Sequence, residues 1–335
     1  MNLIDKSHIV CCTDDNYAPY CGCMIISLLQ NGKCHNPVIH ILTDNLSIDN
    51  KKKIVDIVQD NGGTICWHIV DDNKLVNAKF RKKNPLSRAA YFRILLPSIL
   101  DQNINVVLYL DCDLIIKSDI SYLFSIDIRN YALAAVSDLI EEPRSDEHRF
   151  QFPLSYNEFY FNSGVMLINL HYWRNNNSES QLIEFSERER TVFFHDQDAL
   201  NYVFKSKWLM LPPDTCYFNG CLYEQINFKR KRDYINYNKN PKIIHFASNE
   251  KPWHNIPYYP NRSVFMEYFK KTKWGNNVIN INKKNSIMST ARFLFITYRN
   301  IMFACPILLR IFADIFVFIL SIISLGRINY FKWKH

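Results

Sequence analysis

Two aspartates, Asp111 and Asp113, directly follow a hydrophobic stretch at residues 104–110. Side chains two residues apart point to the same side of an extended chain, so these carboxylates would repel each other unless a cation lay between them. Hard carboxylate oxygens suit Mg²⁺ or Mn²⁺, and either ion also chelates a diphosphate. The alternative is a pair of solvated loop acids. The hydrophobic stretch before the pair favours the metal site.

Other polar side chains follow two further hydrophobic stretches. Residues 9–13 run into the acidic and polar segment 14–17, and a short stretch at residues 243–246 contains His245 and precedes Lys251. Carboxylate, imidazole and ammonium groups are the types that bind metals and phosphates. We therefore treat both segments as candidate parts of one site.

Ten cysteines are spread without a repeating spacing and without a C-x-x-C pair, which argues against a disulfide scaffold and against a zinc site. We interpret Cys11, Cys12, Cys21 and Cys23 as small apolar residues on a strand and on the helix after it. Charged residues within the first eight positions interrupt any signal-peptide core, so we expect a cytoplasmic protein with reduced thiols.

The elements that must position these residues alternate between strand and helix. Ser47 is a plausible helix N-cap, and Gly62 and Gly63 form a stop signal. The pattern predicts strands at residues 9–13, 38–42, 64–70, 104–110 and 133–136, and helices at residues 18–29, 47–60 and 87–100. Such alternation indicates an α/β fold with a largely parallel, doubly wound sheet. These sheets bind ligands at the carboxyl ends of their strands, where the polar segments above lie.

Further motifs appear in a characteristic order: residues 87–93 (SRAAYFR), 160–173 (YFNSGVMLINLHYW), 195–201 (HDQDALN) and 243–254 (IIHFASNEKPWH). Together with the D-x-D pair they resemble the family 8 glycosyltransferases of the GT-A fold. Within that family the chain looks most like bacterial enzymes that add glucose or galactose to the lipopolysaccharide core. The resemblance covers residues 7–275. It implies a Rossmann-like, mostly parallel sheet with helices on both faces.

The resemblance assigns metal and nucleotide roles. Asp111 and Asp113 would bind Mn²⁺ or Mg²⁺ together with His245. The alternative for His245 is a structural role at a strand end, with its ring hydrogen-bonded within the protein. Arg93 would contact the donor sugar or diphosphate, and Lys251 the β-phosphate; their alternatives are a helix surface charge and a solvated lysine. The residues implied to line the nucleotide cleft are Cys12, Thr13, Asp14, Asn16, Tyr17, Pro85, Leu86, Ser87, Cys112 and Ser248.

The donor sugar needs hydrogen bonds to several hydroxyl groups, and the resemblance assigns these to Asp138, Asn162, Asp196 and Gln197. Gln197 resembles the residue nearest the anomeric carbon. An amide is a poor nucleophile, so a covalent intermediate is not the obvious route. The family retains anomeric configuration, and a same-face displacement fits that outcome better. Asp196 and Asp198 have an alternative as ordinary acids at a helix N-terminus, which we prefer for Asp198.

The chain departs from the family pattern at two positions. Ser248 stands where the family often has glycine, which permits close backbone approach to phosphate. Serine carries a Cβ atom and permits this approach less easily. Cys112 stands within D-x-D where threonine or alanine is commoner, and a small residue still fits there.

The C-terminal part is strongly basic: residues 227–335 hold 19 Lys/Arg and 4 Asp/Glu, against a formal net charge of +8 for the whole chain. A basic run at residues 229–232 has no accompanying helix-turn-helix, RRM or zinc pattern, so we expect no nucleic-acid partner. Residues 301–325 are apolar apart from a narrow polar stripe, and the uninterrupted stretch 315–325 is too short to span a bilayer. We favour an in-plane amphipathic helix on an anionic membrane; a core-packing helix and a spanning anchor are the alternatives.

We therefore expect a catalytic GT-A domain at residues 1–275 and a basic, amphipathic membrane-associating segment at residues 276–335. The expected activity is metal-dependent, retaining transfer of glucose or galactose from UDP-glucose or UDP-galactose to lipopolysaccharide or another glycolipid acceptor. The expected location is peripheral, on the cytoplasmic face of the inner membrane. Two rivals are a metal-dependent phosphohydrolase or nucleotidyltransferase, and a non-catalytic glycan-binding relative.

Overall fold

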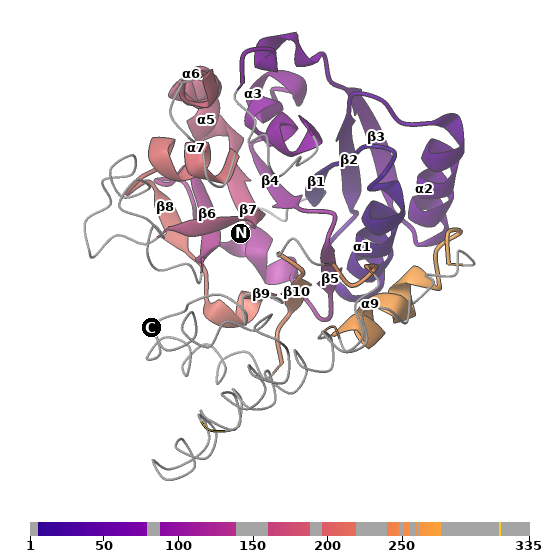
Figure 1. Ribbon diagram of the computed structural model, residues 1–335. Helices are drawn as coiled ribbons and strands as arrows, with labels where there is room; N and C mark the ends of the chain where they lie inside the picture. The colour runs from indigo at the N-terminus through magenta and orange to yellow at the C-terminus, as the bar shows by residue number, and fades with distance from the viewer. Residues whose placement is uncertain are drawn as a thin grey trace.

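The computed structural model describes residues 6–78, 88–138, 160–187, 196–218, 240–247, 251–254, 259, 261–275 and 315. They form an α/β fold around a seven-stranded sheet with the strand order β3-β2-β1-β4-β7-β6-β8 (Figure 1). Its strands are β1 (His8–Cys12), β2 (Val38–Thr43), β3 (Thr64–Ile69), β4 (Val106–Leu110), β6 (Leu133–Ser137), β7 (Phe161–Asn169) and β8 (Trp208–Met210).

The order of the strands reverses at β1. The chain runs outward from β1 through β2 to β3, and β4 then lies on the other side of β1. β1 to β4 are parallel, as are β6 and β8, whereas β7 is antiparallel to both β4 and β6. The carboxyl ends of β1 and β4 therefore meet at a switch in strand order, where open α/β sheets bind ligands. The predicted Rossmann-like, mostly parallel sheet is confirmed.

Helices cover both faces of this sheet, because side chains alternate along each strand. Ile9 and Cys11 of β1 face one apolar core, and Val10 and Cys12 face the other. The first core includes α1 (Ala18–Asn31), α2 (Ile48–Asp60) and α9 (Arg262–Phe269). The second includes the 3₁₀ helix η2 (Arg88–Leu95), α3 (Leu96–Ile99), α5 (Leu170–Asn175), α6 (Ser178–Glu187) and α7 (Asp196–Val203). Although far apart in the sequence, α9 and α1 pack side by side (Figure 1).

A second, three-stranded sheet lies beyond the carboxyl end of β4. It consists of β5 (Leu114–Ile116), β10 (Ile243–His245) and β9 (Cys216–Phe218), with β10 in the middle. β10 runs antiparallel to β5 and parallel to β9. Three short 3₁₀ helices complete the described elements: η1 (Asp72–Leu75), η3 (Ser121–Ser125) and η4 (Pro213–Thr215).

Most predicted elements lie within two residues of their expected bounds. Ser47 caps α2 as predicted, because its hydroxyl accepts a hydrogen bond from the backbone N–H of Asn50 at 3.3 Å. The single helix predicted for residues 87–100 is wrong: residues 88–99 form η2 followed by one turn of α3. Pro97 lacks the N–H that would bond to the carbonyl of Arg93 in a continuous α-helix.

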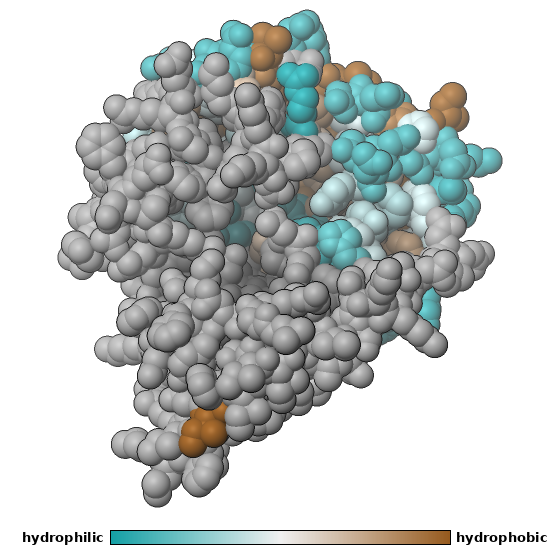
Figure 2. Space-filling model, viewed as in Figure 1, coloured by the Kyte–Doolittle hydropathy of each residue, from teal (hydrophilic) through white to brown (hydrophobic). Residues whose placement is uncertain are grey.

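The surface, the cysteines and the helix lengths of the described residues bear on the class of protein. Figure 2 shows mainly hydrophilic side chains over the α2 side of the molecule, with apolar ones scattered among them. The eight described cysteines are free thiols. Within the described ranges, none of the helices combines the length and the apolar character needed to cross a bilayer. The predicted C-terminal tail and the basic run at residues 229–232 lie outside the described residues, apart from Ile315.

Candidate active site

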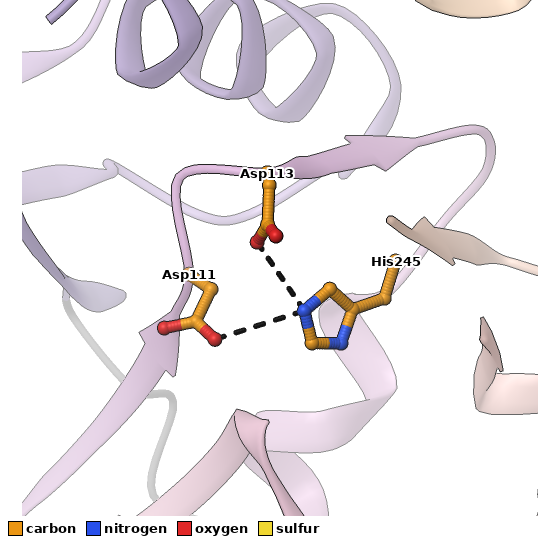
Figure 3. Close-up of side chains that lie close together, drawn as sticks. All are labelled: Asp111, Asp113 and His245. Atoms are coloured by element: carbon orange, nitrogen blue, oxygen red, sulfur yellow. Dashed lines mark ion pairs between the residues drawn. The ribbon is translucent and has the colours of Figure 1, made fainter. Parts of the chain in front are cut away.

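Asp111, Asp113 and His245 converge at the carboxyl end of β4 (Figure 3). The two aspartates lie on the turn between β4 and β5, and His245 ends β10, which pairs with β5 in a register that sets His245 opposite Leu114. Nε2 of His245 is 3.2 Å from Oδ1 of Asp113 and 3.7 Å from Oδ2 of Asp111. The side chains converge through this turn, whereas we had expected them to do so along an extended chain.

The donor atoms of this cluster suit a small divalent cation. Two carboxylates and one imidazole offer ligand atoms that all lie within 4.8 Å of one another. Such a set of oxygen and nitrogen donors fits Mn²⁺ or Mg²⁺. Gly164 of β7 makes room for it: a Cβ atom there would lie 2.2 Å from Cε1 of His245 and 2.8 Å from Oδ2 of Asp111. The residues present therefore fit the metal that the sequence predicts.

Asp111 is held from the side that faces away from His245. Its Oδ1 accepts hydrogen bonds from an Nη atom of Arg93 at 2.8 Å and from the hydroxyl of Tyr109 at 2.9 Å. The Arg93 guanidinium also lies over the Tyr109 ring, 4.3 Å from its centre. These contacts direct the other carboxylate oxygen, Oδ2, toward His245.

Arg93 is buried, so it is not the helix surface charge that was its alternative. Its Nε donates to the carbonyl of Ala90 at 2.8 Å, and an Nη atom donates to the carbonyl of Ser163 at 2.8 Å. Nε also lies 3.0 Å from Oδ2 of Asp196. One guanidinium therefore connects the D-x-D turn with β7 and with the first turn of α7.

Lys251 contacts the other aspartate. Its Nζ lies 2.5 Å from Oδ2 of Asp113 and donates to the carbonyl of Phe246 at 2.8 Å. Its side chain is largely buried, which excludes the solvated lysine considered above. Burial alone would raise the pKa of the Asp113 carboxyl, but the Lys251 ammonium, with a contribution from His245, outweighs it and holds that pKa well below its usual range.

Three of the four residues predicted to contact the donor sugar form one buried network. Oδ2 of Asp138 accepts hydrogen bonds from Nδ2 of Asn162 at 3.1 Å and from Nε2 of Gln197 at 3.2 Å. Oε1 of Gln197 accepts from the backbone N–H of Ser163 at 3.0 Å. Asp138 follows β6 as predicted, Asn162 and Ser163 lie on β7, and Gln197 lies in the first turn of α7. The structure therefore brings these residues together.

The two aspartates of α7 differ. Burial raises the pKa of Asp196 to about 6, although Arg93 works in the opposite direction. Asp198 is fully buried and accepts a hydrogen bond from the Tyr160 hydroxyl at 2.7 Å. Asp198 is thus a first-turn helix acid, as we preferred, but it is buried and bonded inside the protein.

The segment predicted at the nucleotide leads from β1 into α1. Thr13 is buried, Asn16 is exposed, and Oδ1 of Asp14 accepts from the backbone N–H of Tyr17 at 2.9 Å. The Tyr17 ring makes an edge contact with Trp253, with the ring centres 5.9 Å apart. This places the β1 loop beside the segment that carries Lys251.

Residues 8–257 match the sequence model of the family described as Glycosyl transferase family 8. The chain belongs to glycosyltransferase family 8. Family 8 membership implies transfer of a sugar from a nucleotide-sugar donor to a glycan acceptor.

Relatives of this family 8 chain span most of its length. General stress protein A of Bacillus subtilis (strain 168) is 34% identical over 287 residues, which cover 82% of this chain and 97% of that protein. The lipopolysaccharide 1,2-glucosyltransferase of Escherichia coli (strain K12) is 26% identical and covers 78% of this chain and 77% of its own. The structure of the galactosyltransferase LgtC with donor and acceptor sugar analogues has a TM-score of 0.69 at 24% identity, covering 79% of this chain and 96% of that one. The structural likeness confirms the predicted GT-A fold.

Some predicted residues of the family 8 site lie outside the described residues: Pro85, Leu86, Ser87 and Ser248. Cys112 is described and buried, and its Sγ donates to the carbonyl of Cys12 at 3.2 Å, so the two thiol residues join the D-x-D turn to the end of β1.

Sequence reasoning missed the roles of Tyr109, Ser163 and Gly164 in holding the site. A tyrosine inside the hydrophobic stretch before D-x-D was a usable signal, since a buried phenol needs a hydrogen-bond partner. The glycine carried no such signal, because its role depends on a histidine from a distant strand.

Proposed function

We propose that this protein is a retaining hexosyltransferase that moves glucose or galactose from a UDP-sugar to a hydroxyl of a lipopolysaccharide core or related surface glycan, with a divalent cation. The observation that carries the proposal is the joining of two clusters by Arg93, which contacts both Asp111 and Asp196. One cluster has the donor set of a metal–diphosphate site, and the other has buried hydrogen-bonding groups suited to sugar hydroxyls.

The names of relatives support the substrate class. The Escherichia coli relative is a lipopolysaccharide 1,2-glucosyltransferase, and the similar structure is a galactosyltransferase bound to sugar analogues. The hydrogen-bonding network around Asp138 has no role in the hydrolysis of a phosphate, so it counts against the phosphohydrolase alternative. The family relationship supports activity over a purely glycan-binding role.

In the proposed mechanism, Asp111, Asp113 and His245 would hold the cation, which would supply positive charge to the departing diphosphate. Lys251 adds a cation on the same side. Asp138, Asn162 and Gln197 orient the sugar, and Ser163 restrains the Gln197 amide. The acceptor hydroxyl attacks the anomeric carbon from the face that the diphosphate leaves, and its proton passes to the departing phosphate oxygen. Gln197 stabilises positive charge at the anomeric carbon.

We further propose that residues 1–275 are the catalytic domain and that residues 276–335 associate with an anionic membrane surface, on the cytoplasmic face of the inner membrane. Support comes from the basic and amphipathic character of that segment.

Turnover of UDP-glucose and UDP-galactose with truncated lipopolysaccharide acceptors, with and without Mn²⁺, tests the proposal. We expect one donor to be used, Mn²⁺ to be required, and Asp113→Ala to lower turnover by at least ~10²-fold because the metal site is lost. NMR of the product should show an α-linkage. A β-linked product, or unchanged Mn²⁺-dependent turnover in Asp113→Ala, would contradict the mechanism.

A further inference from the structure

Both carboxylates of the D-x-D pair contact a cationic side chain of this chain. Asp111 is paired with Arg93 at 2.8 Å, and Asp113 with Lys251 at 2.5 Å. The protein therefore already offsets part of the negative charge of the pair, with Arg93 shared between Asp111 and Asp196. A divalent cation has to compete with these two side chains for the carboxylates.

The two cations are held very differently. Arg93 is fixed by Ala90, Ser163 and Asp196 as well as by Asp111, and its side chain is 5% exposed. The Lys251 ammonium contacts two acceptors within the described residues, Asp113 and the Phe246 carbonyl, and its side chain is 13% exposed. Lys251 is therefore the cation that can leave.

Asp113 offers no uncommitted oxygen while Lys251 stays. Oδ2 contacts the ammonium at 2.5 Å, and Oδ1 lies 3.2 Å from Nε2 of His245. On Asp111, by contrast, Arg93 occupies Oδ1 and leaves Oδ2 directed toward the site. A divalent ion that reached Asp113 would also lie beside an ammonium of like charge, which disfavours its binding.

The backbone around Lys251 is anchored, so the side chain can turn without moving it. Trp253, two residues later, stacks on Tyr20 with the ring centres 3.6 Å apart and the planes inclined by 10°. The Trp253 ring also packs against Phe265 of α9. The flexible four-carbon stem of a lysine then allows its ammonium to exchange partners within the site.

We propose that Lys251 neutralises Asp113 in the free protein and that the divalent cation and the donor diphosphate displace it together. The ammonium moves from the Asp113 carboxylate to a phosphate oxygen as the cation takes its place. The ligand of this site is therefore the cation–diphosphate pair, and the cation alone binds weakly. This inference rests on the proposed function, since it needs a nucleoside diphosphate donor.

The test measures Mn²⁺ binding without nucleotide, from the loss of the free Mn²⁺ signal in electron paramagnetic resonance. Lys251→Met and Lys251→Gln should bind Mn²⁺ at least ~10-fold more tightly than the wild type, because the competing charge is gone. Lys251→Arg keeps the charge and should bind as weakly as the wild type. Lys242→Met removes a lysine paired with Asp214 at 2.7 Å, outside the D-x-D cluster, and should change Mn²⁺ binding by less than about 2-fold.

Repeating the Mn²⁺ measurement with UDP distinguishes failure of the proposed lysine exchange from failure of the proposed function. The wild type should gain Mn²⁺ affinity with UDP by a larger factor than Lys251→Met, since the lysine helps to bind the diphosphate. If UDP restores Mn²⁺ binding but Lys251→Met and Lys251→Gln bind Mn²⁺ alone no more tightly than the wild type, the exchange is wrong and the metal-dependent function stands. If the wild type binds no Mn²⁺ even with UDP, both are wrong.

Discussion

Arg93 connects the predicted metal site and the predicted sugar site through different atoms of one guanidinium. A buried charge is tolerated when it is paired and hydrogen-bonded, and Arg93 has carboxylates on two sides, Asp111 and Asp196. A lysine carries a single ammonium and lacks the planar fork that reaches these groups at once. The arrangement of donors, and not the charge alone, therefore holds the two halves together.

Removing the Tyr109 hydroxyl should affect the metal site while leaving the surrounding packing in place. Tyr109→Phe keeps the buried ring under Arg93 and deletes the hydroxyl that donates to Asp111. A hydrogen bond to a charged group contributes about 1.5–3 kcal/mol, so Mn²⁺ affinity in the presence of UDP should fall ~10-fold or more. The apparent Kd for Mn²⁺ and the thermal midpoint should be measured together.

Tyr122→Phe is the matched control, since it deletes a hydroxyl that bonds to Thr215, outside the D-x-D cluster. Equal Mn²⁺ affinity in wild type and Tyr109→Phe would mean that Arg93 alone orients Asp111.

At the scale of elements, β7 forms the wall of the site. It runs antiparallel to β4 and β6 and contributes Asn162, Ser163 and Gly164 from consecutive positions. Gly164 faces the metal cluster, and Asn162 and Ser163 bond to the network around Asp138 and Gln197. One strand therefore sets the spacing between the two clusters.

Gly164→Ala should displace the His245 ring, because the added Cβ would lie 2.2 Å from Cε1 of that ring. We expect turnover to fall by at least ~10²-fold, comparable to losing a metal ligand. A double-mutant cycle with His245→Ala isolates the cause, measured as kcat/KM at saturating Mn²⁺. In the His245→Ala background, Gly164→Ala should cost less than ~10-fold. A full additional loss there would show that the glycine acts through other neighbours.

A row of three histidines crosses β1, β2 and β3, which form one side of the sheet. Nδ1 of His8 lies 2.9 Å from Nε2 of His40, and Nδ1 of His40 lies 3.0 Å from Nε2 of His68. Burial, with smaller effects from His68 and His8, lowers the pKa of His40 to about 3. His40 is therefore neutral in the folded protein over a range where an unfolded histidine, with a pKa near 6.5, takes up a proton.

The stability contributed by neutral His40 should be complete above about pH 6.5 and be lost as the pH falls toward 3. Urea unfolding at several pH values between 7.5 and 4.5 gives the free energy of unfolding as a function of pH. The slope of this free energy against pH should be steeper for the wild type than for His40→Gln, by up to about 1.4 kcal/mol per pH unit. Asp196, whose pKa is raised, contributes a slope of opposite sign below pH 6. This contribution cancels because both proteins contain Asp196. His35→Gln, at an exposed position, should keep the wild-type slope. Parallel wild-type and His40→Gln curves would contradict the assignment.

At the level of the whole molecule, the described fold continues through the segment after α9. Trp274 is buried beside Gly22, and its Nε1 donates to Oδ1 of Asn50 at 3.0 Å. Lys273 forms an ion pair with Asp56. The described segment at residues 270–275 thus packs on the core, so a shortened protein has to keep it.

Truncation after Gly275 should leave a folded protein that still turns over UDP-sugar, because the described metal and sugar residues precede it. Truncation after Lys270 also removes Trp274 and should lower the free energy of unfolding by about 3–5 kcal/mol. Urea unfolding of the two truncated proteins, with donor hydrolysis as the activity readout, checks this. Loss of donor turnover in the longer protein would indicate that residues 276–335 pack into the catalytic domain.

Local sequence patterns indicate where most strands and helices lie and which acids follow them. Hydrophobic stretches and caps act over a few residues, so their meaning can be worked out locally, as for Ser47 and the strand before Asp111. The family motifs likewise singled out His245, Lys251 and Gln197 in advance.

Which of these side chains meet depends on contacts between strands that are far apart in the sequence. Asp113 and Lys251 are separated by 138 positions, and their contact depends on the pairing of β10 with β5 in a second sheet. The burial of Arg93 and the need for glycine at position 164 likewise depend on partners from other strands. A sequence records where a strand ends, but hydrogen bonding between distant strands, selected by how the whole core packs, decides what lies beside that end.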